Sequence, residues 1–282
     1  MKKLFSIIAI SACLSTSLIA TETVKTEVTQ TKQQSGTVIN LAGKQRMLTQ
    51  KMSKEALFIA KGIDVDANKV SLTKTTELFD KTLKGLVAGD KDLNLPKTEN
   101  KDILAQLTKV TELWTPFKAN IDKVIAGKSD KSTLEAISKE NLPLLKNMNK
   151  AVGMYAEASG SKLDPKMAKT INLAGKQRML TQKMTKELLL VANGIDVEAN
   201  KENAKKTGEL FETTLKGLTD KCKNADIKKQ LEGVARLWAD YKVIIEKVAD
   251  TNDASLKKAK ALNMPLLKEM NKAVKMFEAS IK

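Results

Sequence analysis

Histidine is absent from this sequence of 282 residues, and cysteine occurs only twice. Without imidazole the chain has no Ser-His-Asp or Cys-His catalytic set and none of the usual zinc or copper ligand combinations. Glycine-rich phosphate loops and clustered carboxylates are also missing, so the sequence predicts no enzyme, no metal site and no cofactor. Two cysteines cannot build a disulfide framework, because Cys13 lies in a segment that we expect to be removed. Cys222 is expected to be a small buried hydrophobe.

Aromatic residues are scarce, at 4% of the chain, and so are acids relative to bases, with 33 Asp and Glu against 49 Lys and Arg. The resulting net charge of +16 raises the question of a nucleic-acid partner. Such binding usually needs a basic patch interleaved with aromatic stacking residues. The lysines are instead spread over every predicted helix, which is typical of a well-solvated surface. We therefore expect no nucleic-acid partner.

Long apolar runs are also rare, and the most apolar stretch is at the N-terminus. Two lysines precede the residues from Leu4 to Ile19, and Ala20 is followed by polar residues. This pattern is typical of a signal peptide, residues 1–20, and predicts a periplasmic or secreted protein. A lipoprotein cleavage site at Cys13 is the weaker interpretation, because the apolar region before it is short. No later span of about 20 apolar residues predicts a membrane crossing.

A duplication organises the rest of the chain. Residues 39–52 recur unchanged as residues 171–184, at an offset of 132. The offset falls to 124 at the two tryptophans, Trp114 and Trp238, so the first unit has extra residues in a loop near 89–96. A period this long indicates a duplicated domain, since solenoid arrays have several shorter repeats.

Apolar residues recur at three- and four-residue steps within each unit, and strand signals are nearly absent. The sequence therefore predicts an all-α fold of two tandem antiparallel four-helix bundles after the signal peptide. The expected divisions are a flexible segment at 21–36, a first bundle at 37–159, a linker at 160–164 and a second bundle at 165–282. The prolines at Pro116, Pro143 and Pro265 are expected to start, kink or interrupt helices locally.

Arginine is the rarest basic residue, with only Arg46, Arg178 and Arg236 in the chain. The first two occupy equal positions in the duplicated helix, on the same face as Gly43 in the first unit. A glycine within a helix costs about 1 kcal/mol relative to alanine and indicates close approach of a neighbouring helix. Because guanidinium pairs in a bidentate way with planar oxyanions, this pattern favours an anion site. An equally weighted alternative is that both arginines lie on solvated surface or pair with a carboxylate.

The duplicated motif, Asn-Leu-Ala-Gly-Lys-Gln-Arg-Met-Leu-Thr-Gln-Lys-Met, resembles the first helix of PilJ-type sensor domains. These domains belong to bacterial type IV pilus chemotaxis transducers and are related to the input domains of the NarX and NarQ nitrate sensor kinases. The resemblance covers both units and implies an extracytoplasmic four-helix bundle. It further implies that two first helices hold nitrate or nitrite between paired arginines beside glycine. The ligand-binding residues implied here are Arg46, Arg178, Gly43 and Gly175, with Asn40, Asn172, Met47 and Met179 as flanking supports.

The duplication suggests that the two units pack as a pseudo-dimer within one chain, with the arginines around one shared anion. A homodimer of the whole chain is the open alternative. The leading hypothesis is an exported, sensory-type protein that binds a small oxyanion, nitrate or nitrite, and presents its state to a membrane receptor, kinase or transporter. The alternative is a structural or adhesive cell-envelope protein without a small-molecule ligand.

Overall fold

The computed structural model describes residues 31–281, which are almost entirely helical. The α-helices are α1 (Lys32–Ala60), α2 (Val65–Ala88), α3 (Lys101–Ile125), α4 (Lys131–Ala158), α5 (Pro165–Ala192), α6 (Val197–Lys221), α7 (Ala225–Glu246) and α8 (Asp253–Ala279). The all-α prediction is confirmed. The predicted signal peptide and residues 21–30 lie outside the described residues.

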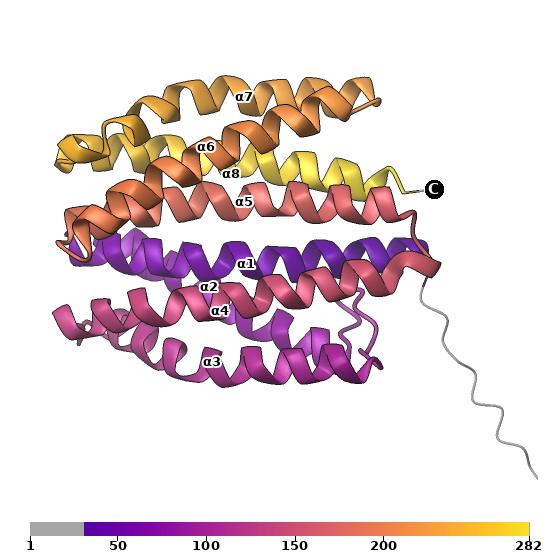
Figure 1. Ribbon diagram of the computed structural model, residues 1–282. Coiled ribbons are helices and arrows are strands. Elements are labelled where there is room, and N and C mark those ends of the chain that lie inside the picture. Colours follow the sequence, from indigo (N-terminus) through magenta and orange to yellow (C-terminus); the bar gives the residue numbers. More distant parts are fainter. Residues whose placement is uncertain (1–30, 282) are drawn as a thin grey trace, which may run out of the picture.

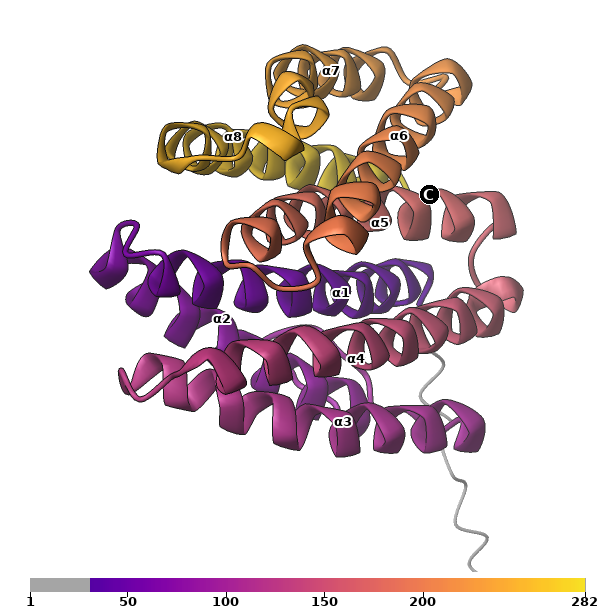
Figure 2. The same cartoon turned by 60° about the vertical axis from the view of Figure 1, so that its left-hand side comes forward.

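Helices α1 to α4 form one bundle and α5 to α8 form the other (Figure 1). The two first helices, α1 and α5, lie side by side in the middle of the molecule, with the remaining helices on either side (Figure 2). The predicted pair of four-helix bundles is confirmed. Because α1 and α5 carry the same motif, the duplicated sequence meets its own copy at the interface between the bundles.

Each bundle has an equivalent aromatic core. The ring of Phe79 lies 4.3 Å from that of Trp114, and Phe211 lies 4.9 Å from Trp238. These tilted pairs bury large apolar surfaces, and both tryptophans are at most 5% exposed. Each bundle therefore has its own aromatic core, and α1 and α5 contact each other through a different face.

The first helix begins earlier than its hydrophobic pattern predicts. Thr31 and Gln34 form a capping box, in which the Thr31 hydroxyl accepts from the Gln34 backbone and the Gln34 side chain accepts from the Thr31 backbone. These bonds satisfy two otherwise unpaired groups at the helix start. Residues 32–36 are therefore helical, and their assignment to a flexible segment, 21–36, was wrong.

The prolines interrupt no helix within the described chain. Pro116 lies inside α3, Pro143 inside α4 and Pro265 inside α8, so the expected starts or interruptions were wrong, whereas a local kink at these positions stays a prediction. A proline removes one backbone hydrogen bond, but most helix stability in proteins comes from packing of the apolar face. Buried residues line each of these helices on both sides of its proline.

The bundles differ in the connection between their second and third helices. Residues 89–100 link α2 to α3, and this loop folds back so that Asp90 and Leu95 exchange two backbone hydrogen bonds of 2.8 Å. Only residues 222–224 link α6 to α7. The extra residues of the first unit therefore lie in this loop, as the change of offset predicted. Within residues 31–281, no helix combines the length and apolar character needed to cross a membrane.

Candidate functional site: a paired arginine cluster between the bundles

Arg46 on α1 and Arg178 on α5 are among the largest fully buried side chains of the described chain, each only 1% exposed. Burial follows from their positions, because the face that carries them packs against the other first helix rather than water. Placement on solvated surface, one of the two alternatives for these arginines, is therefore wrong.

Hydrogen bonds from the two arginines cross between the bundles. Nη2 of Arg46 donates to the backbone carbonyl of Asn172 at 3.0 Å, and Nη2 of Arg178 donates to the carbonyl of Asn40 at 3.0 Å. The predicted flanking asparagines thus contribute their backbone oxygens. The arrangement is reciprocal, as expected for two copies of one surface placed face to face.

The last helix of each bundle holds the other end of each guanidinium. Nη1 of Arg46 donates to Oδ1 of Asn149 at 2.7 Å, and Nη1 of Arg178 donates to Oδ1 of Asn271 at 2.9 Å. Neither asparagine was predicted from the sequence. They lie in the duplicated Met-Asn-Lys-Ala-Val segments of the last helices, and this second duplication was the signal that could have found them.

Gly43 and Gly175 let the guanidinium groups approach the helix backbones. A Cβ at Gly43 would lie 3.3 Å from Nη2 of Arg46 and 3.7 Å from Nη2 of Arg178. A Cβ at Gly175 would lie 3.4 Å from both atoms. Both guanidinium groups are therefore within van der Waals distance of the same two points, so the structure brings the two arginines and two glycines into one cluster.

The cluster concentrates positive charge. Burial, and then the charge of Arg178, lowers the pKa of Arg46 to about 9, and burial lowers that of Arg178 to about 10. Both groups stay charged at neutral pH. The pKa of Lys44 is lowered by burial and by Arg178, and that of Lys176 by burial and by Arg46. Four cationic side chains therefore act on one region of low dielectric.

No carboxylate in residues 31–281 lies within 4.0 Å of either guanidinium group. In the same part of the chain, Nε of Arg46 and Nε of Arg178 are buried without a hydrogen-bond acceptor. Pairing of the arginines with a carboxylate, the other alternative, is therefore wrong for the described residues. Buried cations without counter-charge are strongly unfavourable, so the arrangement suits an anionic ligand.

One acid does influence the cluster from a greater distance. Oε2 of Glu278 on α8 accepts from the Asn40 side chain at 2.5 Å, and its charge raises the pKa of Arg178 against the larger effect of burial. The equivalent residue of the first repeat, at an offset of 122, is Ala156. The two halves of the cluster are therefore electrostatically unequal.

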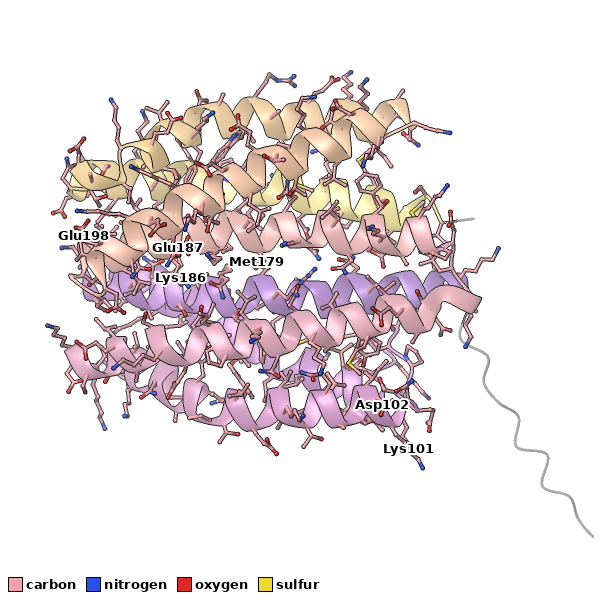
Figure 3. The ribbon with its side chains drawn as sticks, in the orientation of Figure 1. Lys101, Asp102, Met179, Lys186, Glu187 and Glu198 are labelled. Atoms are coloured by element: carbon pink, nitrogen blue, oxygen red, sulfur yellow. The ribbon has the colours of Figure 1, made fainter. Side chains whose placement is uncertain are left out.

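The remaining predicted residues are Met47 and Met179. Both are 5% exposed, and Figure 3 labels Met179 on α5. The structure places them among the buried residues of the first helices and gives them no hydrogen bond with the guanidinium groups in the described chain. Their supporting role stays a prediction.

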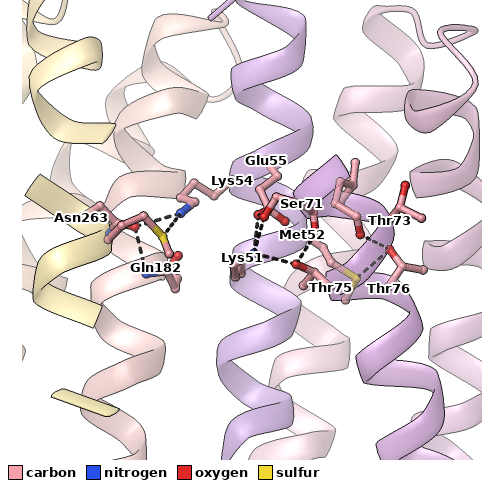
Figure 4. Close-up of polar contacts among 12 residues, drawn as sticks. Lys51, Met52, Lys54, Glu55, Ser71, Thr73, Thr75, Thr76, Gln182 and Asn263 are labelled. Carbon is pink, nitrogen blue, oxygen red and sulfur yellow. Dashed lines mark hydrogen bonds and ion pairs between the residues drawn. The ribbon is translucent and has the colours of Figure 1, made fainter. Parts of the chain in front are cut away.

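A second reciprocal contact was also missed. Lys54 on α1 donates to Oδ1 of Asn263 in the second bundle at 2.8 Å (Figure 4), and Lys186 on α5 donates to Oδ1 of Asn141 in the first at 3.1 Å. Both lysines are nearly fully buried. Lysine is usually a surface residue, so periodicity alone gave no reason to place either one inside.

Comparison with known proteins identifies the family of both repeats. Residues 28–139 and 164–264 match the family described as the N-terminal domain of type IV pili methyl-accepting chemotaxis transducers, PilJ. The chain belongs to the PilJ family. Each match falls on one repeat, so the PilJ domain is present as a tandem duplicate, and the resemblance seen in the sequence is confirmed.

A curated relative of this chain is the methyl-accepting chemotaxis protein McpN of Pseudomonas aeruginosa, 31% identical over 123 residues. The match covers 44% of this chain and 22% of McpN, so the chain spans about a fifth of that relative. A solved structure described as the ligand-binding domain of the P. aeruginosa nitrate receptor McpN is also similar. It has 31% identity and a TM-score of 0.39, with 44% of this chain and 96% of that chain covered. The family is one of sensory ligand-binding domains rather than catalytic ones.

Proposed function

We propose that this protein binds a small planar oxyanion, nitrate or nitrite, between Arg46 and Arg178 at the interface of its two bundles. The observation that carries the proposal is the convergence of two buried guanidinium groups without a carboxylate in ion-pair range in residues 31–281. A planar anion offers several acceptor oxygens to two planar donors. The McpN domain, a nitrate receptor by its description, supports nitrate as the first ligand to test.

One chain supplies both halves of the proposed site. The crossing hydrogen bonds from each arginine to the opposite first helix support an intramolecular pseudo-dimer over a homodimer of whole chains. In this arrangement the anion reduces repulsion between two guanidinium groups and stabilises the packing of α1 on α5. The exported protein would then present its anion-bound or anion-free state to a membrane receptor, kinase or transporter.

Isothermal titration with nitrate, nitrite, chloride and sulfate tests the ligand. We expect saturable binding of nitrate or nitrite at one site per chain and a higher unfolding temperature in the presence of the bound anion. At a ligand concentration of 100 times Kd, binding stabilises the fold by about 2.7 kcal/mol.

The matched variants are Arg46→Met with Arg178→Met, and Arg236→Ala as the control on an exposed position of α7. The double variant should lose the nitrate response yet remain folded, because methionine fills apolar space and removes the repulsion between two buried cations. Arg236→Ala should bind as the wild type does. Absence of heat for every anion with the wild type would contradict the proposal and favour a structural envelope protein.

A further inference from the structure

The second bundle has a cavity of about 700 Å³ that is separate from the arginine cluster. Its walls come from α5, α6, α7, α8 and the short α6–α7 connection. The apolar wall residues include Met167, Leu173, Leu218, Ile227 and Phe277. A volume of this size is typical of small-molecule sites, which are mostly apolar with a few polar groups.

The equivalent position in the first bundle is partly filled. A smaller cavity of about 200 Å³ remains there, lined by the counterparts of some residues of the larger cavity, including Ser35, Val38 and Tyr155, and by Pro96 to Glu99 of the long loop. The loop is held in place by Thr98, whose hydroxyl donates to the Leu86 carbonyl at 2.6 Å. The extra loop of the first repeat therefore fills part of the space that stays open as a cavity in the second repeat.

A pair of equivalent glycines gives the sharpest contrast. A Cβ added at Gly85 on α2 would lie 3.1 Å from Cδ1 of Leu95, a loop residue that is 5% exposed. A Cβ added at Gly217, its counterpart on α6, would meet nothing within 4 Å. The space that Leu95 occupies in one bundle is open in the other.

The wall residues change in step with the missing loop. Tyr155, whose hydroxyl lies 2.6 Å from that of Thr98, is replaced by Phe277. Ser35 is replaced by Met167. The change to Phe277 removes a hydroxyl that would lose its Thr98 partner in the absence of the loop, and the change to Met167 makes the wall more apolar. Val38 becomes Thr170, which leaves one added hydroxyl in the wall.

The rim changes in charge. Lys166, Lys169 and Lys221 stand where the first repeat has Gln34, Thr37 and Gly89, and Lys223 is a fourth lysine of the rim. One acid, Asp164, is also present. None of the four lysines forms an ion pair within the described residues. An apolar interior with a cationic rim is complementary to a ligand with an apolar body and an acidic head group.

We propose that this cavity is a second binding site, for a free anionic amphiphile with a carboxylate or sulfonate head and an apolar body. The apolar body lies against Phe277 and Leu218, and the head group lies among the rim lysines. This site does not depend on the arginine cluster.

Fluorescence of anilinonaphthalene sulfonate, itself an anionic amphiphile, provides the test with the full chain. We expect saturable enhancement that decanoate displaces and decyltrimethylammonium, of equal chain length and opposite charge, does not. Gly217→Leu should fill the cavity and weaken dye binding at least tenfold. Gly153→Leu is the matched control, because Gly153 on α4 also has no neighbour within 4 Å of an added Cβ and lies outside the cavity.

A second pair of variants tests whether the charge of the rim lysines contributes to binding. Lys169→Ala with Lys221→Ala should weaken decanoate several-fold, whereas Lys109→Ala with Lys146→Ala, on exposed positions of α3 and α4, should not. Unchanged circular dichroism of each variant shows that it is folded. Equal dye binding by Gly217→Leu and wild type overturns the proposal, as does displacement by the cation as readily as by decanoate. Displacement by phosphatidylglycerol vesicles but not by decanoate overturns the assignment to a free ligand.

Discussion

The two first helices share an identical segment, residues 39–52 and 171–184, whereas the starts of these helices, the ends of the last helices and the loops between the second and third helices differ. Arg46 and Arg178 make the same bonds to opposite bundles, and Lys54 and Lys186 do the same about two helical turns further along each first helix. A two-fold interface needs the same surface on both sides, which fixes the sequence of both first helices together. Residues outside that interface had no such restriction and have diverged.

The divergence changes charge and cavities without changing the fold. The fourth helix of the second repeat carries Glu278 and Lys260 where the first repeat has Ala156 and Ser138. The loop that closes the first bundle is absent from the second. The side-chain differences supply natural templates, so that single substitutions at these positions can convert one repeat toward the other.

The largest effect is expected from the buried lysines of the interface. Burial lowers the pKa of Lys54 to about 7 and that of Lys186 to about 8. Adjacent Glu55 and Glu187 oppose the decrease, and Lys51 and Lys183 add to it. Lys54 is lower because Lys260 also acts on it.

These shifts predict that stability rises with pH. Between the folded pKa, about 7 or 8, and the unfolded value, about 10.4, the unfolded chain binds more protons than the folded one. Unfolding free energy should therefore increase from pH 7 to pH 10, and the contribution of Lys54 is on the order of 3 kcal/mol. Below about pH 7 both states are protonated and the effect of Lys54 is constant.

Urea unfolding at several pH values measures how the free energy of unfolding depends on pH. Lys54→Met should flatten the rise more than Lys186→Met, and exposed Lys109→Met should leave it unchanged. The methionine variants leave no asparagine oxygen without a partner, because Gln182 still donates to Asn263 and Gln50 to Asn141. Equal pH dependence of wild type and both buried-lysine variants would contradict the prediction.

The next effect concerns the loop that distinguishes the bundles. Leu95→Ala removes the side chain that packs on Gly85, and a buried leucine of this kind is worth about 2 kcal/mol or more. Thermal unfolding should show the loss, while Leu93→Ala, a less buried residue of the same loop, should cost less. A loss for Leu95→Ala no larger than for Leu93→Ala would mean that the loop does not close the first bundle.

The sequence predicted the elements of this fold well because the evidence for them is local and occurs twice. Helical periodicity identified every helix, and the repeat offset located the loop that Leu95 anchors. The early start at Lys32 was missed because a capping box is a side-chain geometry, not a hydrophobic pattern. The uninterrupted helices at Pro143 and Pro265 were missed because tertiary packing outweighs local propensity there.

The site was only half predictable. Equal positions of two rare arginines indicated that they share a role, and glycine spacing indicated close approach. The partners Asn149 and Asn271 and the asymmetric Glu278 depend on how segments more than 90 residues apart are brought together. Helix periodicity within one segment does not predict which residues of a distant helix lie opposite it.

The smallest effect is expected from Glu278, the acid that makes the two halves of the proposed anion site unequal. Glu278→Ala gives the second repeat the residue of the first and removes the only carboxylate found to influence either arginine in residues 31–281. Nitrate should then bind up to about tenfold more tightly, about 1.4 kcal/mol, at low salt, and the gain should shrink as salt screens the partly exposed carboxylate. Ala156→Glu, the reverse change in α4, should weaken nitrate by placing an acid at the equivalent position beside the other half of the cluster. Titration of nitrate into wild type and both variants measures the order of affinities, Glu278→Ala, wild type, Ala156→Glu. If Glu278→Ala binds nitrate more weakly than wild type, the carboxylate positions Asn40 for the ligand rather than competing with it, because Asn40 donates to Glu278 and its carbonyl accepts from Arg178.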